Sequence, residues 1–357
     1  AGYMKEKAPE TAVLFVGTPT GMERELVAKA GYDYAAVEVS SFQRKLNAAG
    51  IRHNLHTVRV LASSGRQARA ILRDFRPDLV VGTGGYASYP MVKAAARAHL
   101  PTAVHESNMV PGLTTKLLES YADVIMVGFE DCRQHYKHPE RIAVTGTPVR
   151  GDFFRLSREE ARKKLGFDDS MCILSFGGSL GAGCINDAMA ELIPWHVKNG
   201  LAINHIHGYG GMGRDTFPKA MEQTGVPMKS DRLRITEYIN DMDVCLAAAD
   251  LVICRSGAST LAELEAVGRG SILIPSPIVT GNHQLHNANV LGNAGAAIVI
   301  EQKDASPQRI IQEVEKLYQN RAKLEQMAVH AKGLEIPDTA DRIWKVIEGL
   351  TASKQGK

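Results

Sequence analysis

MCILSFGGSLGAG (residues 171–183) is an apolar run that stops at two glycines and leads directly into the helical pattern CINDAMAELI. This order predicts a buried strand, a loop with few side chains and the start of a helix. The free N–H groups of such a loop and the positive end of the helix dipole point to one spot, which favours phosphate binding. A tight glycine turn without a ligand explains this loop equally well when it is taken alone.

Two later segments repeat the pattern. DLVICRSGASTLAELEAV (250–267) predicts a second strand, polar turn and helix, and IPSPIVTGNHQLHNANVL (274–291) predicts a third strand end before a polar helix start. The carboxyl ends of parallel strands meet at one edge of a sheet, where open α/β folds bind ligands. The sequence therefore predicts one site for a nucleotide diphosphate. No GxxxxGK[ST] motif supports P-loop chemistry, and no acid follows Gly183 at the spacing of dinucleotide-binding folds.

Strand-like and helical runs alternate along the whole chain, which predicts parallel sheets joined by right-handed crossovers. At 357 residues the chain exceeds the size of one hydrophobic core, so two domains are expected. Pro148 and Gly151 break the alternation before a charged helical segment. We predict an α/β protein with two Rossmann-like domains that face each other across a cleft, with parallel sheets flanked by helices, at residues 1–150 and 151–335.

Composition restricts the cellular setting. No segment approaches the roughly 18 uninterrupted apolar residues of a membrane span, and the start AGYMKEKAPE has no apolar leader core. The five cysteines form no CxxC pair, which is typical of reduced thiols in a cytoplasmic protein.

The net charge of +3 conceals an uneven distribution. Residues 1–150 carry 19 Lys and Arg against 14 Asp and Glu, whereas residues 151–357 carry 23 against 25. Between residues 40 and 73 there are seven basic residues, no acid and several interleaved apolar residues. This pattern suits a face on an anionic membrane surface, and it suits a solvated basic helix equally well. Nucleic acid is not an expected partner, because the domain is only mildly basic and has no recognition motif.

Several motifs together resemble one family. The chain is similar to the MurG family, in order and rough spacing, through GTGGYAS (82–88), HESNMVPGLTTKLL (105–118), TGTPVR (145–150), SFGGSLGA (175–182), YINDM (238–242), SGASTLAE (256–263) and NHQLHNA (282–288). The resemblance implies the GT-B fold and an inverting hexosyltransferase of peptidoglycan synthesis, cell-wall biogenesis and cell division that requires no cofactor. Its substrates would be UDP-N-acetylglucosamine (UDP-GlcNAc) and undecaprenyl-diphospho-MurNAc-pentapeptide. The implied location is peripheral, on the cytoplasmic side of the plasma (inner) membrane.

The resemblance also assigns the donor site. Backbone amides from Gly178 to Ala182 would hold the diphosphate together with Arg150, and Glu263 would accept hydrogen bonds from the ribose. Glu263 also fits a capping box with Thr260, so its role stays open. The backbone of Ile239 would read the uracil, and Gln284 with Asn287 would hydrogen-bond the sugar hydroxyls. The complete set of implied donor-binding residues is Asn108, Arg150, Gly178, Ser179, Leu180, Gly181, Ala182, Ile239, Ser259, Thr260, Leu261, Glu263, Gln284 and Asn287.

The implied reaction needs stabilisation of the leaving diphosphate and a base for the acceptor hydroxyl. By resemblance, the base would come from Glu106, our preferred candidate, or from its neighbours His105 and Asn108. The acceptor's diphosphate would lie on Thr83, Gly84, Gly85 and Tyr86. No metal is expected, because His283 and His286 have no acidic or cysteine partner nearby.

The chain departs from the family at its start and in three motif positions. AGYMKEKAP resembles only the end of the helix that follows the family's first strand and GGTGGH loop. About 20–25 residues of ordinary strand, loop and helix would then have no counterpart, which would leave a vacant position in the middle of a parallel sheet. It would also remove the family's leading candidate base. Ser107, Thr147 and Leu180 replace residues that are usual in the family.

Two alternative functions stay open. One is an isomerase like UDP-GlcNAc 2-epimerase, which needs no lipid acceptor. The other is a truncated, catalytically inactive UDP-sugar-binding protein. At the carboxyl end, PDTADRIWKVIEGL continues a helical pattern. By resemblance, residues 336–350 form a helix that crosses back to the first domain, and residues 351–357 are expected to form a disordered tail.

Overall fold

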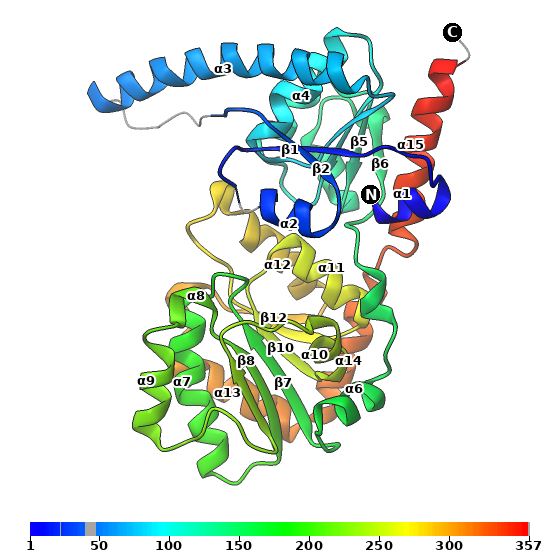
Figure 1. The fold of residues 1–357 in the computed structure, drawn as a ribbon. Helices are drawn as coiled ribbons and strands as arrows, with labels where there is room; N and C mark the ends of the chain where they lie inside the picture. The colour runs from blue at the N-terminus through cyan, green and yellow to red at the C-terminus, as the bar shows by residue number, and fades with distance from the viewer. Residues whose placement is uncertain (22, 40–47, 356–357) are drawn as a thin grey trace. The chain divides into compact units, whose positions relative to one another are not determined.

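The computed structural model describes residues 1–21, 23–39 and 48–355 (Figure 1). The chain divides into two compact units, unit 1 (Ala1–Gly146 with Asp338–Lys357) and unit 2 (Thr147–Pro337). Each unit contains parallel strands and helices, which confirms the predicted two-domain α/β fold. The division between Gly146 and Thr147 lies close to the predicted boundary at residue 150.

Unit 2 is built on one six-stranded parallel sheet in the order β12-β11-β10-β7-β8-β9. Its strands are β7 (Met171–Phe176), β8 (Ile203–Gly208), β9 (Leu233–Thr236), β10 (Leu251–Cys254), β11 (Gly270–Leu273) and β12 (Ala297–Val299). The chain builds the sheet outward from β7 in one direction and then returns to add β10 on its other side. The strand order therefore reverses between β7 and β10, and loops at such a reversal form the ligand crevice of open α/β sheets.

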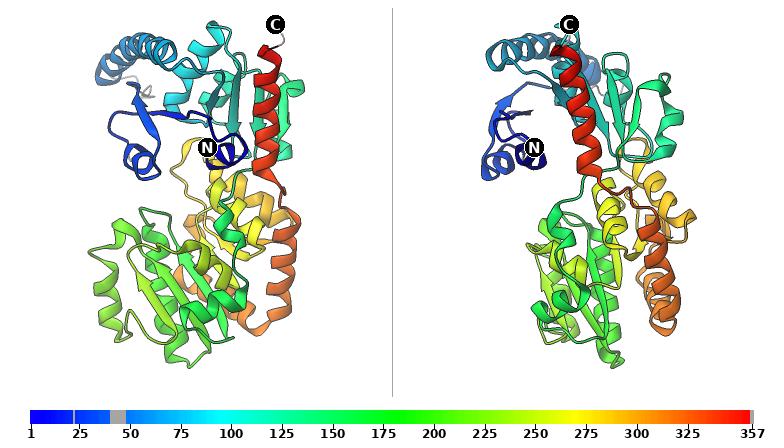
Figure 2. Two further views of the ribbon diagram at one scale, coloured as in Figure 1. Left: turned by 45° about the vertical axis from the view of Figure 1, so that its right-hand side comes forward. Right: turned by 90° about the vertical axis from the view of Figure 1, so that its right-hand side faces the viewer.

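Helices cover both faces of this sheet, as the views in Figure 2 show. The described helices of unit 2 are η3 (Gly151–Phe154), α6 (Arg158–Leu165), α7 (Gly183–Lys198), α8 (Gly210–Gly213), α9 (Phe217–Thr224), α10 (Met242–Ala248), α11 (Ala258–Val267), η4 (Thr280–Asn282), α12 (His283–Asn293), η5 (Gln302–Asp304), α13 (Pro307–Gln319) and α14 (Arg321–Gly333).

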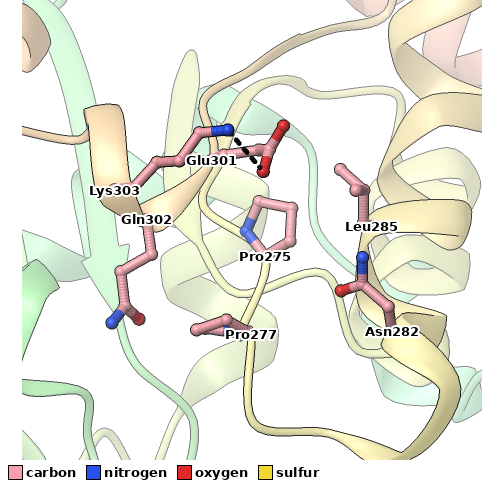
Figure 3. A pocket seen from close by; sticks show the side chains of 7 residues that line it. All are labelled: Pro275, Pro277, Asn282, Leu285, Glu301, Gln302 and Lys303. Carbon is pink, nitrogen blue, oxygen red and sulfur yellow. Dashed lines mark ion pairs between the residues drawn. The ribbon is translucent and has the colours of Figure 1, made fainter.

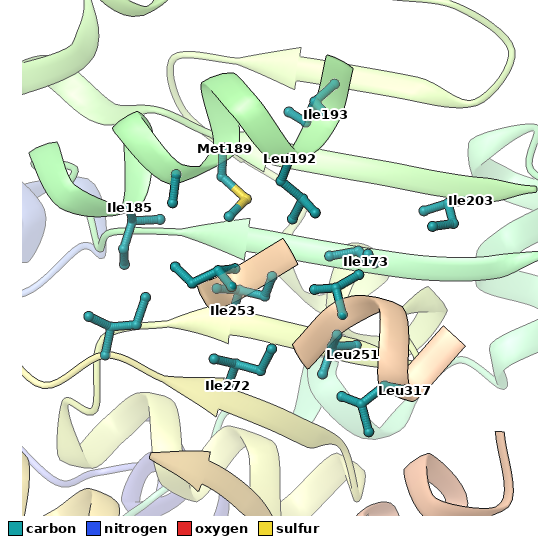
Figure 4. Close-up of a cluster of buried hydrophobic side chains, with 14 of the residues drawn as sticks. Ile173, Ile185, Met189, Leu192, Ile193, Ile203, Leu251, Ile253, Ile272 and Leu317 are labelled. Atoms are coloured by element: carbon teal, nitrogen blue, oxygen red, sulfur yellow. The ribbon is translucent and has the colours of Figure 1, made fainter. Parts of the chain in front are cut away.

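Side chains that alternate along the strands of unit 2 supply two apolar cores. Ile173 and Ile253 point to the face covered by α7 and α13, where they pack with Leu192 and Leu317 (Figure 4). Leu174 and its neighbours on the other face pack against α10, α11 and α12. Full burial of one such side chain contributes about 1.5–3 kcal/mol. Both faces are mainly apolar, and the buried polar residues Ser175, His205 and His207 pair with one another, so we expect polar side chains for a ligand at the strand ends.

Unit 1 contains two parallel sheets, one in the order β1-β2 and one in the order β3-β4-β5-β6. The strands are β1 (Leu14–Gly17), β2 (Asp33–Ala36), β3 (Val80–Gly82), β4 (Thr102–Glu106), β5 (Val124–Val127) and β6 (Ile142–Val144). The helices are α1 (Gly2–Lys7), α2 (Glu23–Lys29), α3 (Ala48–Phe75), α4 (Gly85–Arg97), α5 (Leu113–Leu118), η1 (Glu130–His135), η2 (Pro139–Arg141) and α15 (Thr339–Gln355).

The two sheets of unit 1 share one apolar cluster. Val16 of β1 and Val80 of β3 both pack against a cluster of buried residues that includes Met91 and Ala95 of α4. Among the described strands, β1 pairs only with β2 and β3 only with β4. One edge of each strand is therefore unpaired in the ranges that the structure covers.

The carboxyl-terminal helix α15 belongs to unit 1, where Tyr3 of α1 donates a hydrogen bond to Asp341 over 3.2 Å. It continues to Gln355, so the predicted tail is wrong for residues 351–355, because the helix does not end at Leu350. Residues 356 and 357 lie outside the described residues. So do residues 40–47 of the predicted basic membrane face, whose remainder forms much of α3.

Candidate functional site

The loop after β7 lies at the reversal of strand order. Phe176, the last residue of β7, is in register with Cys254, the last residue of β10, so the loops that follow these two strands begin side by side. Gly178, Ser179 and Leu180 are exposed. Their N–H groups donate to no protein acceptor in the described part of the chain. Together with the start of the 16-residue helix α7, they form a concentration of positive partial charge.

Two residues of this loop differ from the prediction. The N–H group of Gly181 donates to the carbonyl of Gly178 over 3.0 Å, so this amide is already used within the loop. Ala182 is 6% exposed and its side chain belongs to the core under α7. The exposed loop residues whose N–H groups meet no described protein acceptor are therefore residues 178–180, and the Gly181 amide is already used by the fold.

Gly181 fixes the loop against the next strand end. A Cβ atom on Gly181 would lie 2.3 Å from the carbonyl oxygen of Tyr209, and the residue has a φ of 85°. A Cβ atom on Gly210 would lie 2.3 Å from the Gly181 nitrogen. Only glycine allows two backbones to approach this closely, and only glycine adopts the positive φ without strain. The loops after β7 and β8 are thus locked together by contact between their backbones.

The second loop leads from β10 into α11. The helix begins at Ala258 with Gly257 as its N-cap and has no side-chain cap, so Thr260 lies inside the helix. The capping-box alternative for Thr260 and Glu263 is therefore wrong. Ser259 is exposed and Thr260 half-buried at this helix start.

Glu263 is half-buried, and no described protein group is hydrogen-bonded to its carboxylate. Burial raises the pKa of Glu263, and the positive charge of Arg150 opposes that rise. Arg150 itself is exposed and lies 5.3 Å over the ring of Phe153. The structure therefore brings two predicted donor residues together, and the Glu263 carboxylate is available as an acceptor.

Three other predicted donor residues occupy different surroundings. The side chain of Ile239 is 6% exposed and packs on Gly208, so only its backbone is available at the strand end, as predicted. The predicted donor-binding role of Leu261 does not fit the structure, because its side chain is fully buried and its N–H group donates to the carbonyl of Gly257. The predicted role of Asn287 does not fit the structure either. It is fully buried and its Nδ2 donates to the Ser256 carbonyl over 3.4 Å, so it stabilises the loop after β10 and does not face a ligand.

Gln284 lies at the start of α12 and is half-buried. Its Oε1 accepts from the N–H group of Ser276 over 2.9 Å, which leaves the amide nitrogen for a ligand. Beside it, a cavity of about 230 Å³ is lined by Pro275, Pro277, Asn282, Leu285, Glu301, Gln302 and Lys303 (Figure 3). None of these seven residues was assigned to the site from the sequence, although Asn282 and Leu285 lie within the NHQLHNA motif.

The third loop leads from β3 into α4 in unit 1. Gly84 and Gly85 have φ angles of 83° and 72°, and the Tyr86 side chain is 60% exposed. The N–H groups of Gly85 and Tyr86 donate to no acceptor among the described residues, whereas the Gly84 carbonyl accepts from the Ser88 hydroxyl. With the preceding Thr83, this helix start has the exposed amides expected of a diphosphate site.

Glu106 differs most from its prediction. It is 5% exposed, and its two oxygens accept four hydrogen bonds, from the Asn108 N–H (3.0 Å), Asn108 Nδ2 (2.9 Å), the Gly112 N–H (2.9 Å) and Thr115 Oγ1 (2.7 Å). A buried carboxylate whose two oxygens face this many donors is a structural acceptor of the local fold. These bonds commit both Glu106 and the alternative candidate Asn108 to the local fold, so the structure does not support the preference for Glu106 as the base.

His105 is also committed to the fold. It is 7% exposed, its Nε2 donates to the Gly146 carbonyl over 2.9 Å, and its Nδ1 lies 3.3 Å from the Ser107 hydroxyl. Burial lowers the pKa of His105. The ring is therefore neutral and has a hydrogen-bond partner at each nitrogen, so the structure does not support His105 as the base.

We expect Glu106→Gln to destabilise unit 1 by about 2 kcal/mol, because one carboxylate oxygen is replaced by a donor that faces other donors. Urea unfolding measures this change. Glu130→Gln is the matched control, since Glu130 is an exposed carboxylate paired with Arg133. If Glu106→Gln left stability unchanged but abolished the acidic limb of the pH–rate profile, Glu106 would be the base after all.

Comparison with known sequences places the whole chain in one family. Residues 172–343 match the glycosyltransferase family 28 C-terminal domain, and residues 1–127 match the corresponding N-terminal domain. A transferase from Acetivibrio thermocellus is 40% identical over 99% of this chain and 94% of its own length. A homologue from Caldanaerobacter subterraneus is 38% identical over 96% of this chain and 92% of its own length. Both are named UDP-N-acetylglucosamine–N-acetylmuramyl-(pentapeptide) pyrophosphoryl-undecaprenol N-acetylglucosamine transferase.

Solved structures agree on the fold. The crystal structure of Acinetobacter baumannii MurG superposes with a TM-score of 0.72 and 27% identity, covering 97% of this chain and 94% of that one. A UDP-N-acetylglucosamine 2-epimerase from Listeria monocytogenes superposes with a TM-score of 0.65 over 97% of this chain and 90% of its own. At 15% identity, the second likeness concerns the fold alone.

Proposed function

The chain belongs to the MurG family within glycosyltransferase family 28, and we propose that it transfers N-acetylglucosamine from UDP-GlcNAc to undecaprenyl-diphospho-MurNAc-pentapeptide. The observation that carries this proposal is the exposed loop of residues 178–180, whose amides face no protein acceptor at the reversal of strand order in unit 2. A diphosphate satisfies such amides, and the sugar that it carries is then held near Gln284.

In the proposed reaction, the muramoyl hydroxyl oxygen attacks the anomeric carbon while the bond from that carbon to the UDP oxygen breaks, which inverts the configuration. Negative charge grows on the leaving diphosphate, where the loop amides, the start of α7 and Arg150 stabilise it. The amides of Gly85 and Tyr86 at the start of α4 suit the acceptor's own diphosphate. We do not assign the base to Glu106 or His105, since their hydrogen bonds serve the fold.

The test is a product analysis with labelled UDP-GlcNAc and the lipid acceptor. Transfer yields labelled lipid and UDP in equal amounts. Epimerisation would yield no labelled lipid and an N-acetylmannosamine product. A binding-only protein would show a raised Tm with UDP-GlcNAc but no turnover. The epimerase alternative now rests on fold likeness at 15% identity, which does not favour that reaction over transfer.

Glu263→Gln should weaken binding of both UDP and UDP-GlcNAc about tenfold, because a charged acceptor for the ribose hydroxyls becomes neutral. The Tm should not fall, since the half-buried carboxylate has no hydrogen-bonding protein partner among the described residues. Isothermal titration calorimetry measures the affinities. A loss confined to UDP-GlcNAc would contradict the ribose role, because UDP carries the same ribose.

We further propose that unit 1 binds an anionic membrane surface on the cytoplasmic side of the plasma membrane. Leu113 and Leu117, four residues apart on α5, are 68% and 50% exposed, and Lys116 between them is exposed. On α3, Arg66, Arg69 and Arg73 are exposed. Exposed apolar residues beside basic ones are typical of interfacial binding. In the part of the chain that the structure describes, no helix has the length and apolarity needed to span a bilayer.

Flotation with phosphatidylglycerol vesicles should recover the wild-type protein, whereas Leu113→Ser/Leu117→Ser should reduce recovery several-fold, since each leucine loses its apolar area. Val329→Ser is the matched control, because Val329 is an equally exposed aliphatic residue of unit 2, with 69% exposure. Equal recovery of the wild type with neutral and anionic vesicles would exclude the electrostatic part of this proposal.

A further inference from the structure

Arg255 directly follows β10 and joins three strand ends through one guanidinium group. Its Nη1 donates to the carbonyl of Ile274 over 2.9 Å and to that of Pro275 over 3.1 Å, and both acceptors follow β11. Its Nη2 donates to Oε1 of Gln302 over 2.6 Å, in the segment after β12. Figure 3 shows Pro275 and Gln302 among the side chains that line the cavity. A planar group with several donors can satisfy acceptors on separate segments at once, which a lysine cannot do.

The residue after Arg255 continues this connection on the other side of the loop. Ser256 is fully buried, and its Oγ donates to the backbone carbonyl of Gln284 over 2.7 Å. Gln284 in turn accepts from the Ser276 N–H group through its side chain. The segment from Ile274 to Gln284 is therefore held at its beginning by Arg255 and at its end by Ser256.

The diphosphate loop is held differently. Its position depends on the backbone contact of Gly181 with Tyr209. From α7 toward Arg255, the structure links the Cys184 thiol to Oε1 of Gln302 over 3.5 Å, and a thiol is a weak donor. Loss of Arg255 should therefore loosen the start of α12 much more than the loop at residues 178–180.

We propose that Arg255 is a positioning residue that fixes the start of α12 and thereby aims the free amide nitrogen of Gln284 at the sugar of the nucleotide donor. This inference rests on the proposed function, because it assumes that the sugar lies at Gln284. Arg255 acts through the carbonyls of Ile274 and Pro275 and through Gln302, and it does not itself touch the substrate.

The experiment compares affinities for UDP-GlcNAc and UDP by titration calorimetry. Arg255→Met should raise the Kd for UDP-GlcNAc at least tenfold and leave the Kd for UDP within twofold, since only the sugar contact is displaced. Arg232→Met is the matched control. Arg232 also makes a charged pair and a hydroxyl contact in unit 2, with Asp168 and Ser170, but these partners precede β7 at the opposite edge of the sheet. The control should change neither Kd.

If Arg255→Met does not fold, a second pair of variants tests whether Arg255 positions the start of α12 through Gln302. Gln302→Leu removes one acceptor and should raise the Kd for UDP-GlcNAc about threefold, whereas Gln302→Glu retains the acceptor and should bind like the wild type. The positioning role would be overturned if Arg255→Met or Gln302→Leu lost the same affinity for UDP as for UDP-GlcNAc. It would also be overturned if neither of these two variants lost affinity for UDP-GlcNAc. If the wild-type protein bound UDP but not UDP-GlcNAc, the proposed function would fail instead, which is a separate result.

Discussion

Gly181→Ala should lower kcat/KM for UDP-GlcNAc by about 100-fold or more, because the new methyl group meets the Tyr209 carbonyl oxygen at 2.3 Å and the backbone has a φ of 85°. A positive φ alone costs about 1–2 kcal/mol for a residue with a Cβ atom. The backbone contact adds a clash that only a shift of the loop can relieve. Such a shift moves the amides of residues 178–180 away from the diphosphate, so the loss appears in both binding and turnover.

Two neighbouring glycines separate these effects. Gly178 has a φ of 91° but no atom within 4 Å of an added Cβ, so Gly178→Ala tests backbone strain without the clash. It should lose about tenfold or less, as expected for strain of about 1–2 kcal/mol. Gly183 has open space and no positive φ, so Gly183→Ala should behave like the wild type. Equal losses for Gly181→Ala and Gly178→Ala would mean that the contact with Tyr209 does not fix the loop.

Unit 2 should unfold in mild acid because its core contains a chain of neutral histidines. His196 Nε2 lies 3.2 Å from His205 Nδ1, and His205 Nε2 lies 2.9 Å from the Ser175 hydroxyl. The same hydroxyl lies 2.9 Å from His207 Nδ1. All four residues are buried, with at most 1% exposure. Hydrogen bonds link the neutral rings through Ser175, whereas His196 Nδ1 and His207 Nε2 are buried and have no hydrogen-bond partner among the described residues. A proton added to any ring would place an uncompensated charge in the core.

The direction in which stability changes with pH follows from the lowered pKa values of the three histidines. Burial lowers the pKa of His196 to about 4 and that of His207 to about 3, and it lowers the pKa of His205 well below its ordinary value. An unfolded histidine has a pKa of about 6.5. The stabilisation is therefore complete above pH 6.5 and is lost as the pH falls toward the folded-state pKa values, because the unfolded state binds more protons. For His196 alone, the loss reaches about 3 kcal/mol.

Urea unfolding between pH 7 and pH 4 measures this dependence, which should correspond to uptake of up to about three protons on unfolding of unit 2. His207→Phe is the informative variant, because its ring can keep the contact with Phe217 at 4.7 Å between centroids but cannot be protonated. It should reduce the uptake by about one proton. A pH dependence unchanged by this substitution would show that the histidine chain does not govern acid unfolding.

Much of the fold could be predicted from local patterns. The apolar run before Gly177 and the helical pattern after Gly183 predicted β7, the loop and α7 within a residue or two. The same reasoning predicted the segments around β10 and α12, and several coincident motifs indicated the family. These features follow from the period of buried side chains and from the backbone freedom of glycine, which a short stretch of sequence contains in full.

The roles of individual polar residues could not be predicted in this way. Glu106 resembled a catalytic base until the folded chain placed Gly112 and Thr115 around its carboxylate. Asn287 resembled a sugar ligand, but the packing of α12 buried it beneath Ser256. Arg255 carried no signal of its own, because its acceptors lie 19, 20 and 47 residues away along the chain.

The sequence alone thus determined the order of strands and helices, the two-domain class and the position of a glycine loop able to bind phosphate. Only the tertiary structure decided which polar atoms stay available for a ligand and which are already satisfied. The physical reason is the range of the two effects. Secondary structure follows from neighbours within a few residues, whereas the hydrogen bonds of a buried polar group depend on whichever distant segments the fold brings to it.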